Sequence, residues 1–172
     1  MVAPDRLRFD FSHNQAVTPE EIADIEAEVN AQIRRNTAVT TRLMAPDQAV
    51  EAGALALFGE KYGDEVRVLS MGEVEGSNYS VELCGGTHVN ALGDIALMTI
   101  VSEGAVASGI RRIEALTGEA ARLHLANRES QLKDVASLFK VSPDEVAARV
   151  ETLLAERRAL EKELSDTKTK LA

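Results

Sequence analysis

Hydrophobic and polar positions alternate along several short stretches of this chain. In residues 6–12 the side chains of Leu7, Phe9 and Phe11 alternate with charged ones, which is the period of a half-buried β-strand. Similar patterns predict five further strands. The run at residues 94–103 is nearly continuous in apolar residues, and a Gly-Ala-rich connection, residues 104–109, joins it to the last strand. These further strands are expected at residues 38–44, 65–71, 79–83, 94–103 and 110–116.

Two helices are predicted between the early strands. The sequence Thr18-Pro19-Glu20-Glu21 combines an N-cap, a proline at the first helical position and a capping-box glutamate. Apolar residues then recur every three or four positions, and the helix is expected to end near Arg34-Arg35-Asn36. A second, short helix is predicted from Pro46 to about Phe58, with Gly59 as its end. Strands and helices in this order favour an α+β fold with a mainly antiparallel sheet.

The pattern becomes helical after Gly118. A helix is predicted over residues 119–140, and Ser142-Pro143-Asp144-Glu145 forms a second capping box before a final helix. This final helix has an apolar seam at near-heptad spacing, made of Val146, Val150, Leu153, Leu160, Leu164 and Leu171. We therefore expect a sheet-containing domain over residues 1–117 and a helical or coiled-coil appendage over residues 118–172. An open seam indicates self-association through residues 142–172, or contact with a further domain.

Composition narrows the possible functions. The 172 residues carry 19 Lys and Arg against 28 Asp and Glu, a formal net charge of −9. Indiscriminate nucleic-acid binding needs a basic surface, so the acidic total argues against that class but leaves room for a local basic patch. The single cysteine precludes a disulfide within the chain, and no apolar run approaches the 18 or so residues of a membrane span. We expect a cytoplasmic protein without a membrane partner.

The candidate chemistry lies in Cys84-Gly85-Gly86-Thr87-His88, which we call the Cys84–His88 loop. Glycine adopts positive φ at little cost, so the two glycines favour a tight turn that brings a thiolate and an imidazole together. Sulfur and nitrogen suit zinc, although a Cys-x3-His pair alone supplies only half a site. Two other interpretations remain open on spacing alone: a buried cysteine beside a glycine turn, and a nucleophilic Cys-His pair.

Four motifs resemble the post-transfer editing region of alanyl-tRNA synthetases, in order and at suitable spacing. They are Arg-Leu-Arg-Phe-Asp-Phe-Ser-His (6–13), Ala-Leu-Phe-Gly-Glu-Lys-Tyr-Gly-Asp (56–64), Ser-Val-Glu-Leu-Cys-Gly-Gly-Thr-His-Val (80–89) and Gly-Ile-Arg-Arg-Ile-Glu-Ala-Leu-Thr-Gly (109–118). The resemblance extends over residues 3–172. It implies the C-terminal part of the editing domain, followed by the start of a helical segment that leads to a C-terminal domain.

What the resemblance implies is a site that hydrolyses tRNA(Ala) mischarged with serine or glycine. In that family zinc is held by a His-x3-His pair and a later Cys-x3-His pair, and the later pair matches Cys84 and His88. Gly85, Gly86 and Thr87 would form the pocket wall and offer backbone N–H donors. Arg111 and Arg112 would contact phosphates or the terminal ribose of the tRNA acceptor end; pairing with an acid such as Glu114 is the equally physical alternative.

The chain also departs from the family pattern. Its histidines stand at positions 13, 88 and 124, so no His-x3-His exists, and the aminoacylation core and its ATP-binding motifs are absent. We expect a zinc half-site that binds the ion weakly or not at all, and no unaided deacylation of tRNA. The alternatives are a free-standing deacylase acting in trans, which would need a complete zinc site, and a non-catalytic module for tRNA binding or dimerisation.

Overall fold

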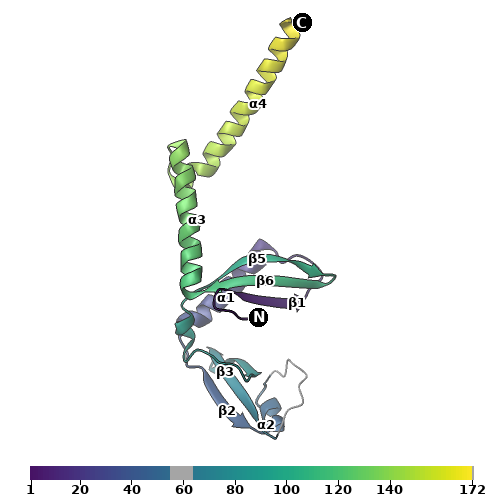
Figure 1. Ribbon diagram of the computed structural model, residues 1–172, viewed down its shortest axis with the longest axis vertical. Coiled ribbons are helices and arrows are strands. Elements are labelled where there is room, and N and C mark those ends of the chain that lie inside the picture. Colours follow the sequence, from purple (N-terminus) through teal and green to yellow (C-terminus); the bar gives the residue numbers. More distant parts are fainter. Residues whose placement is uncertain (55–63, 172) are drawn as a thin grey trace. The chain divides into compact units, whose positions relative to one another are not determined.

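The computed structural model describes residues 1–54 and 64–171 and confirms the α+β fold, with antiparallel sheets and helices. The chain divides into two compact units, Met1–Arg122 and Leu123–Ala172. Both sheets belong to the first unit (Figure 1). The domain limits inferred from the sequence stay a prediction.

The first sheet contains β1 (Leu7–Ser12), β5 (Met98–Ala107) and β6 (Ile110–Thr117), in the order β1-β6-β5 and antiparallel throughout. The predicted limits of β5 were wrong at both ends. The strand was predicted to begin at residue 94, but residues 94 and 95 belong to the 3-10 helix η1 (Leu92–Ile95), after which Ala96 has a φ of 65°. At the other end, β5 continues through most of the predicted connection and turns at Gly109, where φ is 70°. A uniformly apolar run carries no period that marks where a strand begins, which explains the error.

The second sheet contains β2 (Thr40–Met44), β3 (Val66–Val74) and β4 (Ser77–Leu83), in the order β2-β3-β4. Its hairpin turns at Glu75 and Gly76, which both have positive φ, as tight two-residue turns require. The sequence predicted that the fourth strand begins at residue 79, and β4 begins two residues earlier, at Ser77. Helix α2 (Pro46–Glu51) packs on this sheet through Ala49. The predicted helix was too long, because α2 ends at Glu51 and Gly53 follows with a φ of 81°. The rest of that prediction, residues 55–59, and most of the motif at 56–64 lie outside the described residues.

Helix α1 (Pro19–Arg35) begins with the predicted capping box. The Thr18 hydroxyl accepts from the Glu21 N–H at 3.2 Å, and the Glu21 carboxylate accepts from the Thr18 N–H at 2.8 Å. At the other end Asn36 closes the helix in the left-handed region, with φ 52°. The predicted apolar face includes Ile33, which is 4% exposed in a core cluster with Met98 and Ala115.

Polar side chains of α1 form hydrogen bonds with strands of both sheets. Asn30 bonds the N–H and the carbonyl of Met98, at 2.9 and 2.8 Å, and the Glu26 carboxylate accepts from the Ile100 N–H. Toward the second sheet, Gln32 accepts from the Glu73 N–H at 3.2 Å, and Glu28 accepts from the Tyr79 hydroxyl at 2.6 Å. A strand at a sheet edge exposes unpaired backbone groups, and α1 binds three of those of β5, at Met98 and Ile100.

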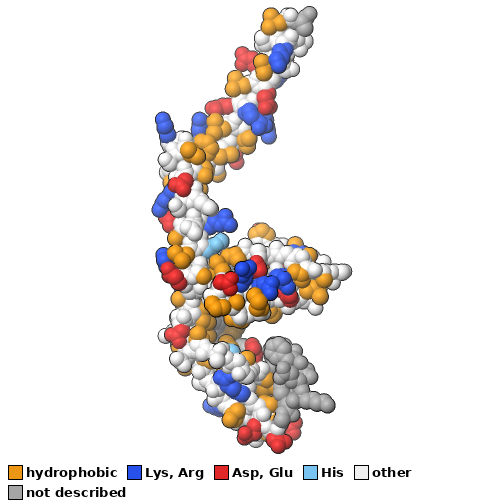
Figure 2. Space-filling model, viewed as in Figure 1, with side chains coloured by type: hydrophobic (Ala, Val, Ile, Leu, Met, Phe, Trp, Pro, Cys, Tyr) orange, Lys and Arg blue, Asp and Glu red, His pale blue; other side chains and the backbone are white. Residues whose placement is uncertain are grey.

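Helix α3 (Gly118–Phe139) is followed by the 3-10 helix η2 (Pro143–Glu145) and helix α4 (Val146–Leu171). The second capping box is formed in part: the Glu145 carboxylate accepts from the Ser142 N–H at 2.9 Å. No residue of α4 is buried, and Leu160, Leu164 and Leu171 are more than half exposed. Hydrophobic and charged side chains are interspersed along α4 (Figure 2). Among the described helices none has the length and hydropathy to cross a membrane.

Candidate metal and substrate site

The Cys84–His88 loop leaves the end of β4 beside the central strand of the second sheet. The Cys84 N–H donates to the carbonyl of Arg67 on β3 at 3.2 Å, extending the β3–β4 pairing by one residue. Beyond it the loop returns, so that the Cys84 Sγ and the His88 Nε2 lie 3.2 Å apart. Cys84 is half-buried and His88 is exposed. The structure therefore brings together the two side chains that the sequence singled out.

This separation suits a shared metal ion. A tetrahedral zinc ion, with bonds of about 2.3 Å to sulfur and about 2.0 Å to nitrogen, places those two ligands about 3.5 Å apart. The observed 3.2 Å reaches that value with a small side-chain movement. The donor set is soft sulfur plus imidazole, the combination that zinc accepts. Cys84 and His88 thus fit two positions of a zinc site.

The glycines act differently from the way the sequence suggested. Neither Gly85 nor Gly86 has a positive φ. A Cβ on Gly86 would lie 3.6 Å from the Cys84 Sγ and 3.8 Å from the His88 Nε2, whereas a Cβ on Gly85 would meet open space. Gly86 therefore leaves free volume beside the Cys84 Sγ and the His88 Nε2. Gly85, Gly86 and Thr87 are all exposed.

Arg67 is a site residue that sequence reasoning missed. Its Nη1 donates to the carbonyl of Cys84 at 3.2 Å and also to the carbonyl of Gly86. In the sequence it is one charged residue between Val66 and Val68, a pattern that any half-exposed strand shows. The role of Arg67 becomes evident only in the structure, where the loop turns back over β3 and its carbonyls meet the guanidinium.

The remaining ligands of a zinc site are not supplied by the parts of the chain that the structure describes. Within residues 1–54 and 64–171 no three His, Cys, Asp or Glu side chains are grouped as a metal site. The ring of His13 lies against that of Phe11, with centroids 6.2 Å apart, and His124 belongs to α3. Among the described residues, Cys84 and His88 therefore lie together without a third donor of these types.

The adjacent arginines of β6 both bind carboxylates. Arg111 makes a two-pronged pair with Glu103 on β5, at 2.5 and 2.6 Å, and Arg112 makes one with Asp10 on β1, at 2.7 Å for both bonds. Hydrogen bonding from Arg111 is the largest cause that lowers the pKa of Glu103, and hydrogen bonding from Arg112 likewise lowers the pKa of Asp10. The charge of each guanidinium is therefore compensated within the sheet.

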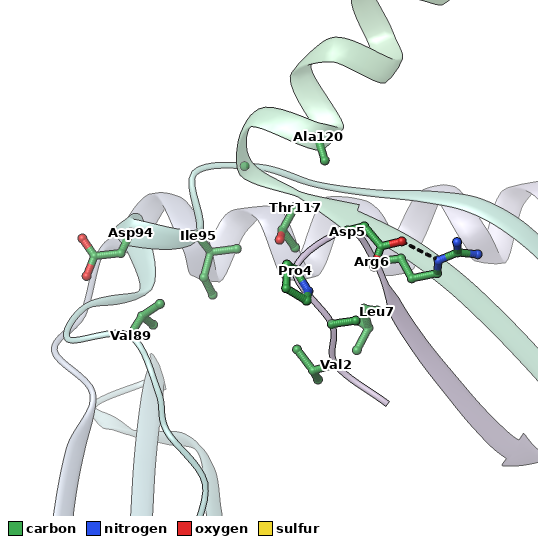
Figure 3. Close-up of a pocket in the computed structure, with 12 residues that line it drawn as sticks. Val2, Pro4, Asp5, Arg6, Leu7, Val89, Asp94, Ile95, Thr117 and Ala120 are labelled. Atoms are coloured by element: carbon green, nitrogen blue, oxygen red, sulfur yellow. Dashed lines mark hydrogen bonds and ion pairs between the residues drawn. The ribbon is translucent and has the colours of Figure 1, made fainter.

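A cavity of about 340 Å³ lies elsewhere in the first unit (Figure 3). Val2, Pro4 and Leu7 form one side of it, Val89 and Asp94 another, and the Asp5–Arg6 ion pair of 3.2 Å stands at its edge. Its lining includes Val89, the residue after His88, but neither Cys84 nor His88. This cavity therefore does not include the Cys84 and His88 side chains.

Comparisons with known proteins agree with the motifs. Residues 66–114 match the family described as the Threonyl and Alanyl tRNA synthetase second additional domain. The chain is 65% identical to an alanine–tRNA ligase of Rhizorhabdus wittichii, 67% identical to one of Sphingopyxis alaskensis and 59% identical to one of Parvibaculum lavamentivorans. Each match covers 100% of this chain and 20% of the relative, so the chain spans one fifth of the length of these curated relatives.

Proposed function

The chain belongs to the alanyl-tRNA synthetase family along its whole length and includes the second additional domain; on this premise we propose that it carries part of an editing site that hydrolyses seryl- or glycyl-tRNA(Ala). The observation that supports the proposal is the 3.2 Å approach of Cys84 and His88 on a loop within the matched residues 66–114. Zinc held there would polarise the ester or activate a water molecule.

Within that site the residues have separable roles. Cys84 and His88 would supply two zinc ligands, while Gly86 keeps open the volume beside them. Gly85 and Thr87 lie on the exposed part of the same loop and would face the aminoacyl end of the substrate. The full sequence has no second cysteine and no His-x3-His pair, so we expect the 172-residue chain to bind zinc weakly and to leave seryl-tRNA(Ala) intact.

Zinc competition against a chromophoric chelator tests this assignment. We expect weak binding at one ion per chain, abolished by Cys84→Ala and by His88→Ala. His13→Ala is the matched control, since it removes a histidine outside the loop, and it should bind like the wild type. Zinc binding that survives in both loop variants would refute the assignment. Deacylation of seryl-tRNA(Ala) by this chain, abolished by Cys84→Ala, would instead support the free-standing deacylase.

For the tRNA partner we propose contact with the acceptor end near β6, with Arg112 as the better candidate of the two arginines. Its side chain is 33% exposed against 15% for Arg111. Its Nε and Nη2 bind Asp10, which leaves the N–H groups of Nη1 to meet a phosphate. Since Asp10 offsets its charge, we expect a modest contribution to affinity.

Self-association through residues 142–172 is a second proposal, supported by the exposed leucines of α4. Sedimentation at several concentrations should show a dimer that dissociates in the double variant Leu160→Glu/Leu164→Glu. Lys162→Glu is the control, because it adds negative charge to the same helix without removing an apolar side chain, and it should dimerise like the wild type. A strict monomer at high concentration would contradict the proposal.

The other interpretations gain no support. The relatives named above are alanine–tRNA ligases rather than free-standing deacylases. A non-catalytic module for tRNA binding or dimerisation would leave the approach of Cys84 and His88 without a purpose. A cytoplasmic location, ATP binding and alanine–tRNA ligase activity are proposals for an intact synthetase.

A further inference from the structure

We infer that Arg67 is the positioning residue of the Cys84–His88 pair, an inference that rests on the proposed function. Arg67 lies on β3, the central strand of the second sheet, between the buried residues Val66 and Val68. Strand pairing on both sides fixes its backbone, with Leu43 opposite it on β2. Its side chain therefore starts from a rigid part of the fold.

Three hydrogen bonds connect Arg67 to the loop. Its carbonyl accepts from the Cys84 N–H, and its Nη1 donates to the carbonyls of Cys84 and Gly86. The two carbonyls lie on either side of Gly85, so the guanidinium fixes the peptide groups that turn the chain back toward β3. Among the described residues it supplies the only hydrogen bond to the backbone of residues 85–88.

The chemistry of this contact requires an arginine-like donor. One Nη carries two N–H groups in a fixed plane, enough for two carbonyls at once. Within residues 1–54 and 64–171 no carboxylate forms an ion pair with Arg67, so the loop carbonyls are its partners there. Outer contacts of this kind hold metal ligands in place, and their loss weakens metal affinity.

A simpler interpretation is that Arg67 only covers the sheet. In that case its removal would lower stability and leave the geometry of the pair unchanged. The distinguishing measurement is therefore the approach of Cys84 and His88 in a folded variant, read without any metal.

The first test is the nuclear Overhauser contact between the β-protons of Cys84 and the ring protons of His88. We expect it in the wild type and in Arg42→Met, a control that removes an exposed arginine from the neighbouring strand β2. We expect it to vanish in Arg67→Met while the amide resonances of β3 and β4 keep their positions. A contact that persists in Arg67→Met, or that is missing from the wild type, would overturn the inference.

The second test uses Co²⁺, whose thiolate absorption reports a bond to Cys84. Loss of an outer contact typically weakens metal binding roughly 10- to 100-fold, and we expect a change of that order in Arg67→Met and none in Arg42→Met. Absence of thiolate absorption in the wild type would refute the proposed metal site, while the Overhauser measurement would still decide the role of Arg67.

Arg67→Lys separates hydrogen bonding from packing. The ammonium carries three donors and can reach one or both carbonyls, so we expect it to retain the Overhauser contact in part and to bind Co²⁺ better than Arg67→Met. A lysine variant as impaired as the methionine variant would show that donation to the carbonyls does not hold the loop, against the inference.

Discussion

The two sheets of the first unit use their arginines in opposite ways. In β1-β6-β5, Arg111 and Arg112 pair with carboxylates of the neighbouring strands. In β2-β3-β4, Arg67 donates to the carbonyls of the loop that carries Cys84 and His88. A guanidinium bound to a carboxylate has its charge compensated, whereas one bound to carbonyls fixes a backbone that no strand partner holds. In the first sheet these arginines connect neighbouring strands, whereas in the second sheet Arg67 holds the loop that carries Cys84 and His88.

The first sheet also depends on helix α1, and we expect the largest effect on this contact from substitution of Asn30. Asn30→Leu removes the partner of both the N–H and the carbonyl of Met98. A buried polar group left unpaired costs about 1–3 kcal/mol, so we expect the free energy of unfolding to fall by about 2–3 kcal/mol, given that Asn30 is only half-buried. Urea unfolding followed through the amide resonances of β5 and β6 measures this loss.

Asn127→Leu is the matched control for that substitution. Asn127 is an exposed residue of α3, so the same chemical change should leave the stability of the sheet within about 0.5 kcal/mol of the wild type. Equal effects of the two substitutions would mean that α1 does not close the edge of β5. The cohesion of the first sheet would then rest on its ion pairs and its apolar core.

The sequence predicted the parts of this comparison that depend on local pattern. The capping box at Thr18, the strand around Phe9 and the spacing of Cys84 and His88 all follow from residues within a few positions of each other. Arg112 and Asp10 are 102 positions apart, and their pairing depends on the register of β1 with β6, which no local pattern contains. Arg67 was missed for the same reason: its partners lie 17 and 19 positions away, across a hairpin.

In the second sheet the two glycines of the loop provide a smaller and more local test. Gly86→Ala places a methyl group 3.6 Å from the Cys84 Sγ and 3.8 Å from the His88 Nε2. That contact is tolerable without a metal ion but intrudes on the volume beside the two ligands. We expect a cost of about 1 kcal/mol, the lower end for added volume, or about fivefold weaker Co²⁺ binding.

Gly85→Ala controls for the change from glycine to alanine. Its Cβ would meet open space and neither glycine has a positive φ, so both variants should fold alike and Gly85→Ala should bind Co²⁺ like the wild type. If both substitutions weaken binding equally, the relevant property is the flexibility of the loop rather than the space beside Gly86. The contrast between the two sheets would then lie in their dynamics.

The smallest effect concerns acid stability in the first sheet. The pKa of Glu103 is held below its ordinary value of 4.5, chiefly by hydrogen bonds from Arg111. A carboxyl group whose pKa is lower in the folded state contributes stability above its unfolded pKa, and this contribution is lost as the pH falls through the folded value. Stability measured by urea unfolding should therefore decline below about pH 4.5. In Glu103→Gln that decline should be shallower, because the titrating group is gone.

Glu82→Gln is the matched control from the second sheet. Glu82 is half-buried on β4 and accepts a hydrogen bond from the Ser80 hydroxyl at 2.6 Å, but the structure gives it no cationic partner among the described residues. Its substitution should leave the acid limb of the stability curve like that of the wild type. The contrary outcome is that the two substitutions reduce the loss of stability at low pH by the same amount. In that case the carboxylate–arginine pairs do not distinguish the first sheet from the second. Arg111 would then be as available to a phosphate as the sequence first suggested.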